Sequence, residues 1–322
     1  MVSISIATYN RAAEVEKTLL TLSRLDPTGC PEYEVLVVDN NSTDATPAVV
    51  ERMASLFGGR LRYVREQRQG LSHARNRAID EARYEVVAYL DDDVDVDPRW
   101  LWHLCDAYTG GDAAGVGGRA YLVFPSPRPA WLGEPIEGLL TKVELGPHRR
   151  PAGVHELYGV NLSFRKDWLR RVGGFRTDVG RVGTKLACGE DDDMIARVIA
   201  LGGTVLYEPE AVVGHRVPPA RMRRKWFWDR CFRGGASDPR LWPDERVTAY
   251  QLLRSTWHVG LMGWRTLRAG LRHGPRSAVC FQHALKVASR SGLCLGLVGE
   301  LRRRGGQARR GPSPLSRVGS SD

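Results

Sequence analysis

The sequence lacks a long hydrophobic run, a paired-cysteine motif and a basic leader segment. No stretch approaches the roughly 20 uninterrupted apolar residues that a transmembrane helix needs. The opening residues, MVSISIATYN, have no basic segment ahead of their apolar stretch, so we expect no signal peptide. The six cysteines lie far apart without a CxxC pair, which argues against a zinc site and a disulfide framework. We therefore expect a cytoplasmic protein with reduced thiols.

Acidic residues are scarce at the C-terminal end of a chain whose net charge is +10. Residues 301–322 contain six arginines and one aspartate, so this segment carries +5, half of the total. Because residues 305–322 are rich in Gly, Ser, Pro and Arg, we expect a disordered tail there. Residues 216–304 are also basic, but their helical pattern and many tryptophans predict a folded helical region.

The first half of the chain alternates apolar runs typical of strands with segments of helical spacing. The candidate strands cover residues 2–7, 33–38, 61–64 and 85–90, and the candidate helices cover 14–22, 46–57 and 71–82. A further strand is expected at 204–209. Such alternation predicts an α/β fold with a largely parallel central sheet. We assign residues 1–215 to this domain.

Polar segments follow three of these strands: TYNR, DNNSTD and DDD. Ligands bind at the carboxyl ends of strands in open α/β sheets, so polar chemistry is expected along this edge. The DDD run, residues 91–93, concentrates like charges that a bound cation would offset. An EF-hand loop starting at Asp93 would need Gly at Pro98 and Glu at Leu104, and a phosphatase-type motif would need Thr or Val at Asp95. The remaining interpretation is a divalent cation, Mg²⁺ or Mn²⁺, bridging the phosphates of a nucleotide.

The neighbouring acids have simpler explanations. Asp97 precedes Pro98 and an apolar helical pattern, which predicts that it is the N-cap of a helix. Asp95 is expected on the surface. The second acidic run, residues 190–193, opens another predicted helix, where acids interact favourably with the helix dipole. A metal-bound nucleotide sugar would also need a general base, and Asp191 is the candidate in this run.

Taken in order, these motifs resemble the family 2 glycosyltransferases. The matching segments are SISIATYNRAAEVEKTLLTL, YEVLVVDNNSTDAT, GLSHARNRAIDEA, VVAYLDDDVDVDPRWL, GVNLSFRKDWLRRVGGF and GEDDDM. The resemblance covers about two thirds of the chain, residues 1–215. It implies a GT-A fold, a Rossmann-like sheet flanked by helices, with a helical C-terminal extension. It also implies inverting transfer from a nucleoside diphosphate sugar, with UDP as the expected nucleotide, to an unidentified hydroxyl acceptor.

The resemblance also implies roles for individual residues. The nucleotide and donor would be held by Thr8, Tyr9, Asn10, Arg11, Asp39, Asn41, Asp91 and Asp92. Asp39 would pair with a uracil N–H, and Asp93 would bind the metal. Asp191 would be the catalytic base, and Glu190 would orient the acceptor or its loop. His215 would add a metal ligand, although a lone histidine is more often structural.

The remaining alternatives concern the helical region and the type of enzyme. Helices over 216–304 would either close over the acceptor site or lie on an anionic membrane. Processive members of the family carry QxxRW before membrane spans; RRKWFWDRC keeps only an arginine and tryptophans, which favours single transfers. A nucleotidyltransferase would need a glycine-rich loop where ATYNRAAE stands, and a non-catalytic sugar-binding module would have damaged acidic motifs. Nucleic acid is not expected as a partner, because acids occupy the strand ends that its phosphates would approach.

Overall fold

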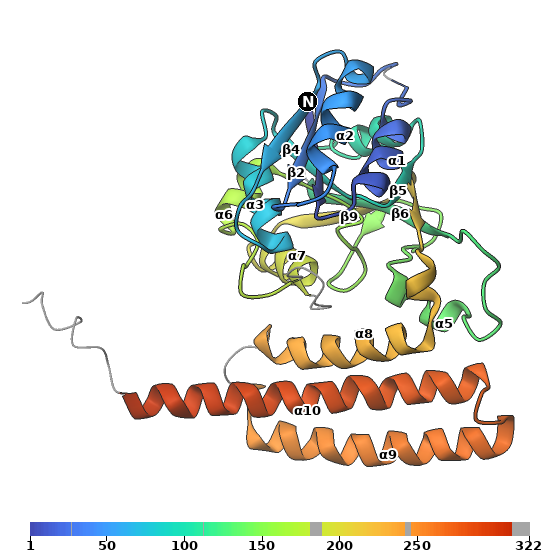
Figure 1. Ribbon diagram of the computed structural model, residues 1–322. Coiled ribbons are helices and arrows are strands. Elements are labelled where there is room, and N and C mark those ends of the chain that lie inside the picture. The colour runs from blue at the N-terminus through green and yellow to red at the C-terminus, as the bar shows by residue number, and fades with distance from the viewer. Residues whose placement is uncertain (27, 112, 181–188, 242–245, 311–322) are drawn as a thin grey trace, which may run out of the picture. The chain divides into compact units, whose positions relative to one another are not determined.

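The computed structural model describes residues 1–26, 28–111, 113–180, 189–241 and 246–310. The chain forms two compact units, Met1–Trp226 and Phe227–Asp322 (Figure 1). The first unit contains the sheet and the second is helical. The α/β fold and the helical C-terminal region are therefore as the sequence predicted, and the units divide after residue 226 rather than 215.

Four strands at the start of the chain form the parallel part of the sheet. They are β1 (Val2–Thr8), β2 (Tyr33–Asp39), β3 (Leu61–Arg65) and β4 (Val86–Asp91), in the order β3-β2-β1-β4. Between them lie α1 (Ala12–Leu22), α2 (Thr46–Met53) with the 3₁₀ turn η1 (Ala54–Phe57), and α3 (Leu71–Glu81). These elements confirm the predicted segments. Their apolar side chains form one continuous core with the rest of the sheet.

The second half of the sheet is mixed, so the expectation of a largely parallel sheet holds only for the first half. Strand β8 (Asn161–Arg165) runs antiparallel to β4, and β6 (Ala113–Val123) runs antiparallel to β8. Strand β9 (Thr204–Arg216) runs parallel to β6 and pairs with two short antiparallel strands, β5 (Val94–Val96) and β7 (Arg150–Pro151).

The glycine-rich strand β6 shows why the sequence analysis did not predict the mixed half of the sheet. Its sequence, AAGVGGRAYLV, has little strand propensity because glycine is depleted in strands. In the fold these glycines allow close approach: a Cβ at Gly115 would lie 2.5 Å from Phe164, and one at Gly118 would lie 2.0 Å from the carbonyl oxygen of Ala211. The requirement for glycine comes from neighbours distant in the sequence.

Short helices complete the first unit: α4 (Trp100–Asp106), α5 (Glu134–Glu137), η2 (Gly138–Leu140), α6 (Lys166–Arg171), α7 (Glu190–Ala200) and η3 (Pro219–Met222). The prediction that Asp97 caps a helix was wrong in position. Its carboxylate accepts a hydrogen bond from the Arg99 N–H at 2.8 Å, and the helix begins only at Trp100. Asp97 therefore stabilises the turn that leads into α4.

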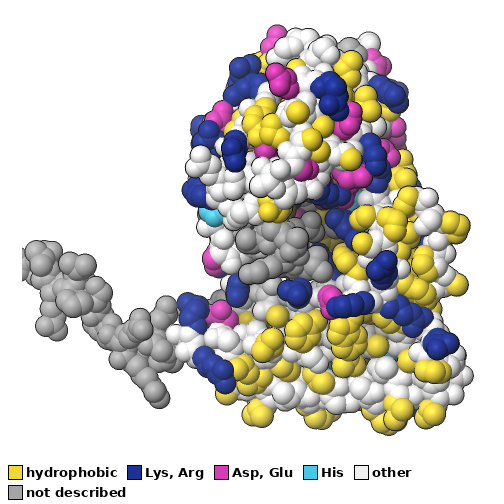
Figure 2. Space-filling view, viewed as in Figure 1, with side chains coloured by type: hydrophobic (Ala, Val, Ile, Leu, Met, Phe, Trp, Pro, Cys, Tyr) yellow, Lys and Arg dark blue, Asp and Glu magenta, His cyan; other side chains and the backbone are white. Residues whose placement is uncertain are grey.

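The second unit is built from helices, beginning within α8 (Arg224–Ser237). It continues through η4 (Asp238–Arg240), α9 (Ala249–His273) and α10 (Ala278–Arg310). Helix α8 packs closely on α10, where a Cβ at Gly292 would lie 1.9 Å from the Phe232 carbonyl oxygen. Hydrophobic side chains are also visible on the outside of the α9–α10 hairpin (Figure 2). Among the described residues, no helix is long and apolar enough to cross a membrane. Helix α10 extends past the predicted end at residue 304, and positions 311–322 of the predicted tail lie outside the described residues.

Candidate active site

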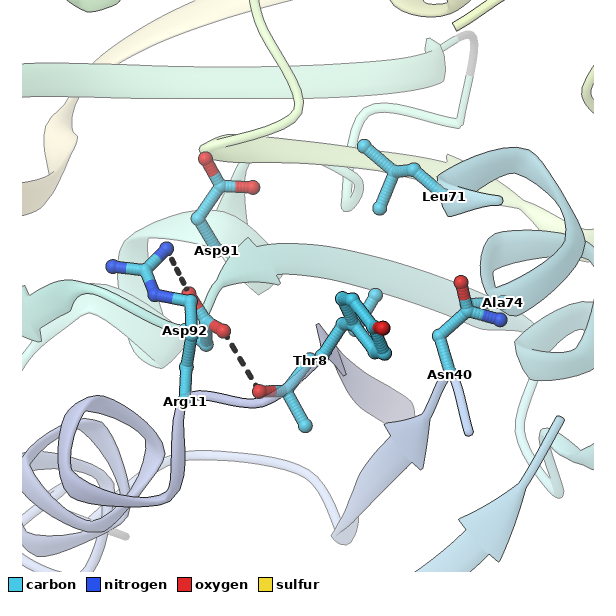
Figure 3. Close-up of a pocket in the computed structure, with 9 residues that line it drawn as sticks. Thr8, Arg11, Asn40, Leu71, Ala74, Asp91 and Asp92 are labelled. Atoms are coloured by element: carbon cyan, nitrogen blue, oxygen red, sulfur yellow. Dashed lines mark hydrogen bonds and ion pairs between the residues drawn. The ribbon is translucent and has the colours of Figure 1, made fainter. Parts of the chain in front are cut away.

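The ends of β1, β2 and β4 meet at one edge of the sheet, as expected for parallel neighbours. Thr8 lies opposite Asp39 in the β1–β2 pair, and Ala7 lies opposite Asp91 in the β1–β4 pair. A pocket opens at this edge (Figure 3). It is lined by Ala7, Thr8, Tyr9, Arg11, Asn40, Leu71, Ala74, Asp91 and Asp92. Five of the predicted donor-site residues are among them: Thr8, Tyr9, Arg11, Asp91 and Asp92.

Asp92, just after β4, connects to the end of β1 and the loop that follows it through a hydrogen bond and an ion pair. Its carboxylate accepts a hydrogen bond from the Thr8 hydroxyl at 2.7 Å and pairs with Arg11 at 2.7 Å. Burial raises the pKa of Asp92 to about 7, although the Arg11 guanidinium opposes that rise. In Figure 3 the Asp91 carboxylate points away from this pair. Asp91 and Asp92 therefore differ in surroundings, although they are adjacent in the sequence.

Asp93 is buried among positive charges. One of its oxygens, Oδ2, lies 2.8 Å from Arg11 and 3.4 Å from Arg221 of η3. The other, Oδ1, lies 3.3 Å from the Nε2 atom of His215 and makes no hydrogen bond. Burial opposes ionisation, but His215, Arg221 and Arg11 outweigh it and hold the pKa of Asp93 well below its usual range. The site thus contains an ionised carboxylate with one unsatisfied buried oxygen.

His215, at the end of β9, is oriented by the turn after η2. Its Nδ1 atom lies 2.8 Å from the carbonyl oxygen of Leu140 and 2.9 Å from the hydroxyl of Thr141. Because a carbonyl oxygen can only accept, Nδ1 carries the hydrogen. Nε2 is then the nitrogen presented to Asp93. A backbone acceptor behind the imidazole is the usual way in which proteins orient a metal-binding histidine.

These side chains fit a divalent cation. Asp91, Asp93 and His215 each offer one ligand atom, and the three atoms lie within 4.8 Å of one another. The unsatisfied Oδ1 atom of Asp93 is one of the oxygens that a cation would satisfy. Two carboxylates and an imidazole suit a cation that accepts oxygen and nitrogen ligands. The structure therefore brings His215 to the predicted metal-binding aspartate across a separation of 122 residues in the sequence (215 − 93).

Three predicted nucleotide-binding residues stabilise loops beside the pocket. Asp39 is fully buried, and its carboxylate accepts hydrogen bonds from the Tyr63 hydroxyl at 2.6 Å and the Ser42 N–H at 2.8 Å. Burial, together with the hydrogen bond from the Tyr63 hydroxyl to Asp39, raises the pKa of Tyr63 to about 12. Asn10 and Asn41 both have positive φ angles, 52° and 68°, which asparagine tolerates better than most residues. Asn40, which the sequence analysis did not select, lines the pocket.

The second acidic run lies at the start of α7 around a buried arginine. Arg75 of α3 pairs with Asp191 and lies 3.5 Å from Glu190. The other oxygen of Asp191 accepts a hydrogen bond from the Gly159 N–H at 2.9 Å. The Arg75 guanidinium also lies 5.3 Å from the ring centroid of Phe175. The two predicted catalytic acids are thus held together on the side of Arg75, whose charge also interacts with Asp91.

Sequence reasoning missed two arginines, Arg75 and Arg216. Arg216 follows His215 on β9 and points to the opposite face, as alternate residues of a strand do. It donates to the Val94 carbonyl oxygen at 2.8 Å and to the Thr18 hydroxyl at 2.8 Å, and it pairs with Glu14 at 3.3 Å. Its side chain also pairs with Asp95. Arg216 therefore connects β9, α1 and the segment after the DDD run.

We expect Arg216→Leu to lower the free energy of unfolding by about 2–3 kcal/mol, because carbonyl and carboxylate acceptors lose a charged donor. Urea unfolding followed by circular dichroism measures this change. Arg52→Leu is the matched control: Arg52 pairs with Glu16 on the exposed surface, so its loss should cost less than about 1 kcal/mol. Equal effects of the two substitutions would contradict a central structural role for Arg216.

A sequence model of glycosyl transferase family 2 matches residues 3–173. The match covers more than half of the chain. The chain belongs to glycosyl transferase family 2. The residues that this family member brings together at the strand ends lie partly inside the matched segment, such as Asp91 and Asp93, and partly beyond it, such as His215.

Two named relatives are similar over most of their length. The succinoglycan biosynthesis protein ExoM of Rhizobium meliloti is 27% identical over 304 residues, which cover 92% of this chain and 93% of that protein. The glucosyl-dolichyl phosphate glucuronosyltransferase of Haloferax volcanii is 28% identical over 241 residues, 73% of this chain and 75% of that protein. These similarities agree with membership of a glycosyltransferase family.

Solved structures agree with the GT-A fold. The mannosyltransferase PcManGT from Pyrobaculum calidifontis, in complex with GDP-Man and Mn²⁺, matches with a TM-score of 0.54 at 22% identity, over 98% of this chain and 77% of that one. GalNAc-T7 with UDP, GalNAc and Mn²⁺ matches with a TM-score of 0.53 at 18% identity, over 72% of this chain and 47% of that one. At these identities the likeness concerns the fold.

Proposed function

We propose that the protein is a metal-dependent, inverting glycosyltransferase that moves a sugar from a nucleoside diphosphate sugar to a hydroxyl group. The observation that carries this proposal is the group formed by Asp91, Asp93 and His215 beside the strand-end pocket. A pocket with a cation site at its edge suits a ligand that combines a flat heterocyclic base with a diphosphate. Family membership favours glycosyl transfer over the nucleotidyltransferase alternative.

In this proposal different residues of the first unit bind the metal and the donor. Asp91, Asp93 and His215 would hold Mn²⁺ or Mg²⁺, which would offset the negative charge that develops on the departing diphosphate. Thr8, Tyr9 and Arg11 would line the donor site, where the Arg11–Asp92 pair fixes the loop in position. Rigid strand ends keep these groups in place before the donor arrives, which lowers the entropy cost of the reaction.

Asp191 would accept the proton of the attacking hydroxyl. Its carboxylate is held by Arg75 and the Gly159 N–H, so its orientation is set before the acceptor binds. Glu190 lies beside the same guanidinium and would orient the acceptor or the neighbouring loop. Direct attack by the activated hydroxyl on the anomeric carbon inverts its configuration and needs no enzyme nucleophile.

The release of free nucleoside diphosphate tests the proposal. We would incubate the protein with UDP-, GDP- and dTDP-sugars in Mn²⁺, Mg²⁺ or EDTA, without an acceptor. Slow hydrolysis of one donor that stops in EDTA is the expected result. Donor binding without turnover would indicate that the acceptor is required. Absence of both binding and turnover with every donor and metal would contradict the proposal.

UDP is the expected nucleotide, with Asp39 as the acceptor of a base N–H. Asp39→Asn should then weaken UDP binding by about 10- to 100-fold, because a hydrogen bond to a charged group is lost. Isothermal titration with UDP and Mn²⁺ measures this change. Tyr63→Phe is the control, since it removes one partner of the same carboxylate but keeps its charge. If Asp39→Asn and Tyr63→Phe weaken binding equally, Asp39 acts through loop structure rather than through the base.

A further inference from the structure

Helix α9 of the second unit exposes a stripe of large hydrophobic side chains (Figure 2). Its members, each 56–82% exposed, are Tyr250, Leu253, Trp257, Trp264, Leu267 and Leu271. Soluble proteins rarely leave a contiguous apolar surface of this kind without a binding partner. We name these six residues the α9 stripe.

The spacing of the α9 stripe places it on one face of the helix. Tyr250, Trp257, Trp264 and Leu271 follow one another at intervals of seven residues, or about two turns. At about 1.5 Å per residue the stripe is roughly 32 Å long. Other α9 residues, such as Ala269, are buried in the second unit. The stripe is therefore a long, straight apolar ridge, which suits an extended surface.

The charges beside the α9 stripe have a single sign. Helix α9 contains no aspartate or glutamate, and its four arginines are all exposed. They are Arg254, Arg265, Arg268 and Arg272. The Arg268 guanidinium lies 5.5 Å from the ring centroid of Trp264, so charge and aromatic surface are adjacent. The occupant of this face must accept both apolar contact and dense positive charge.

These observations favour one occupant. A second copy docked through the α9 stripe would bring arginines against arginines with no acid on either helix to offset them. An apolar ridge flanked by arginines and containing tryptophan and tyrosine is typical of helices that lie in the plane of a bilayer. We propose that the α9 stripe and the four exposed arginines of α9 bind the surface of a bilayer that contains anionic phospholipids. This inference does not rest on the proposed transfer reaction, because such binding needs neither donor nor acceptor.

Vesicle flotation with the full chain tests the proposal. The wild-type protein should float with phosphatidylcholine vesicles containing 30% phosphatidylglycerol, and less with phosphatidylcholine alone or at high salt. Trp257→Gln/Trp264→Gln should lower the partition coefficient about a hundredfold. Arg265→Gln/Arg268→Gln should lower it about 25-fold, about fivefold for each charge.

Matched controls come from exposed residues of the first unit. Leu56→Gln/Leu201→Gln and Arg24→Gln/Arg52→Gln remove the same kinds of side chain from other surfaces and should leave flotation unchanged. Circular dichroism checks that each variant is folded, and sedimentation velocity reports its oligomeric state. Wild-type flotation that is absent, or that the control pairs reduce equally, would overturn the proposal. So would a tryptophan pair that converts a dimer to a monomer without changing flotation, because a second copy would then be the occupant.

Discussion

Replacement of Asp93 by asparagine should lower metal-dependent donor turnover about a thousandfold. The substitution keeps the shape of the side chain but removes the charge that faces His215, Arg11 and Arg221. A bound cation is worth several kcal/mol in stabilising developing charge, and each 1.36 kcal/mol corresponds to a factor of ten in rate. The measurement is nucleoside diphosphate release at saturating donor, with Mn²⁺ affinity determined in parallel by calorimetry.

Asp95→Asn is the matched control for this experiment. Asp95 belongs to the same acidic segment, but it is partly exposed and pairs with Arg216 on the other side of β9. We expect Asp95→Asn to keep turnover within about threefold of wild type, since it touches no group of the cation site. His215→Gln gives a second test that leaves the Asp93 charge in place. If Asp93→Asn and His215→Gln fold normally and still bind Mn²⁺ as tightly as wild type, the cation site is elsewhere.

Replacement of Asp191 by asparagine should slow transfer by about a hundred- to ten-thousandfold, the usual contribution of a general base. Asparagine can still accept the Gly159 N–H but cannot take a proton from the acceptor. Donor and Mn²⁺ affinities should be unchanged, because Asp191 belongs to α7 and not to the group around Asp93. Transfer to the acceptor, once one is found by screening, gives the rate, and hydrolysis to water gives it in the meantime.

Asp193→Asn, on the same helix, controls for damage to α7. Asp193 pairs with Arg197 at 2.6 Å, so its loss should affect stability rather than chemistry. A selective loss of turnover in Asp191→Asn, with normal donor binding, supports the base assignment. Loss of donor binding in Asp191→Asn would instead place this residue in the donor site. Activity above a tenth of wild type would mean that another group takes the proton.

The sequence predicted the parallel half of the sheet and the acids at its edge because both depend on local signals. Apolar runs such as residues 33–38 are bounded by turns, and polar residues at strand ends need no knowledge of distant neighbours. Strand β6 was not predicted because its glycines are explained only by contacts with Phe164 and Ala211. Glycine has a low strand propensity, but the close tertiary contacts of β6 require glycine, and these contacts decide the structure.

The same distinction explains the arginines that sequence analysis missed. Arg75 and Arg216 are indistinguishable in the sequence from surface arginines, since nothing near them marks a buried partner. Their acids lie far away: Arg216 reaches Glu14 across 202 residues of chain. His215 was selected only through the family resemblance. Pairings of this range become visible only when the sheet order β8-β6-β9 is known.

Strand β9 therefore sets a minimum length for a chain that contains the proposed cation site. A chain shortened to the segment that matches the family, residues 3–173, would keep the loop after β1 and the DDD run. It would lack His215, a member of the proposed cation site, and Arg216, which connects β9 to α1. It would also lose a neighbour of β6 in the sheet, exposing an unpaired edge that invites aggregation. The segment that the family model matches is therefore shorter than the segment that must be synthesised before all residues of the proposed cation site are present.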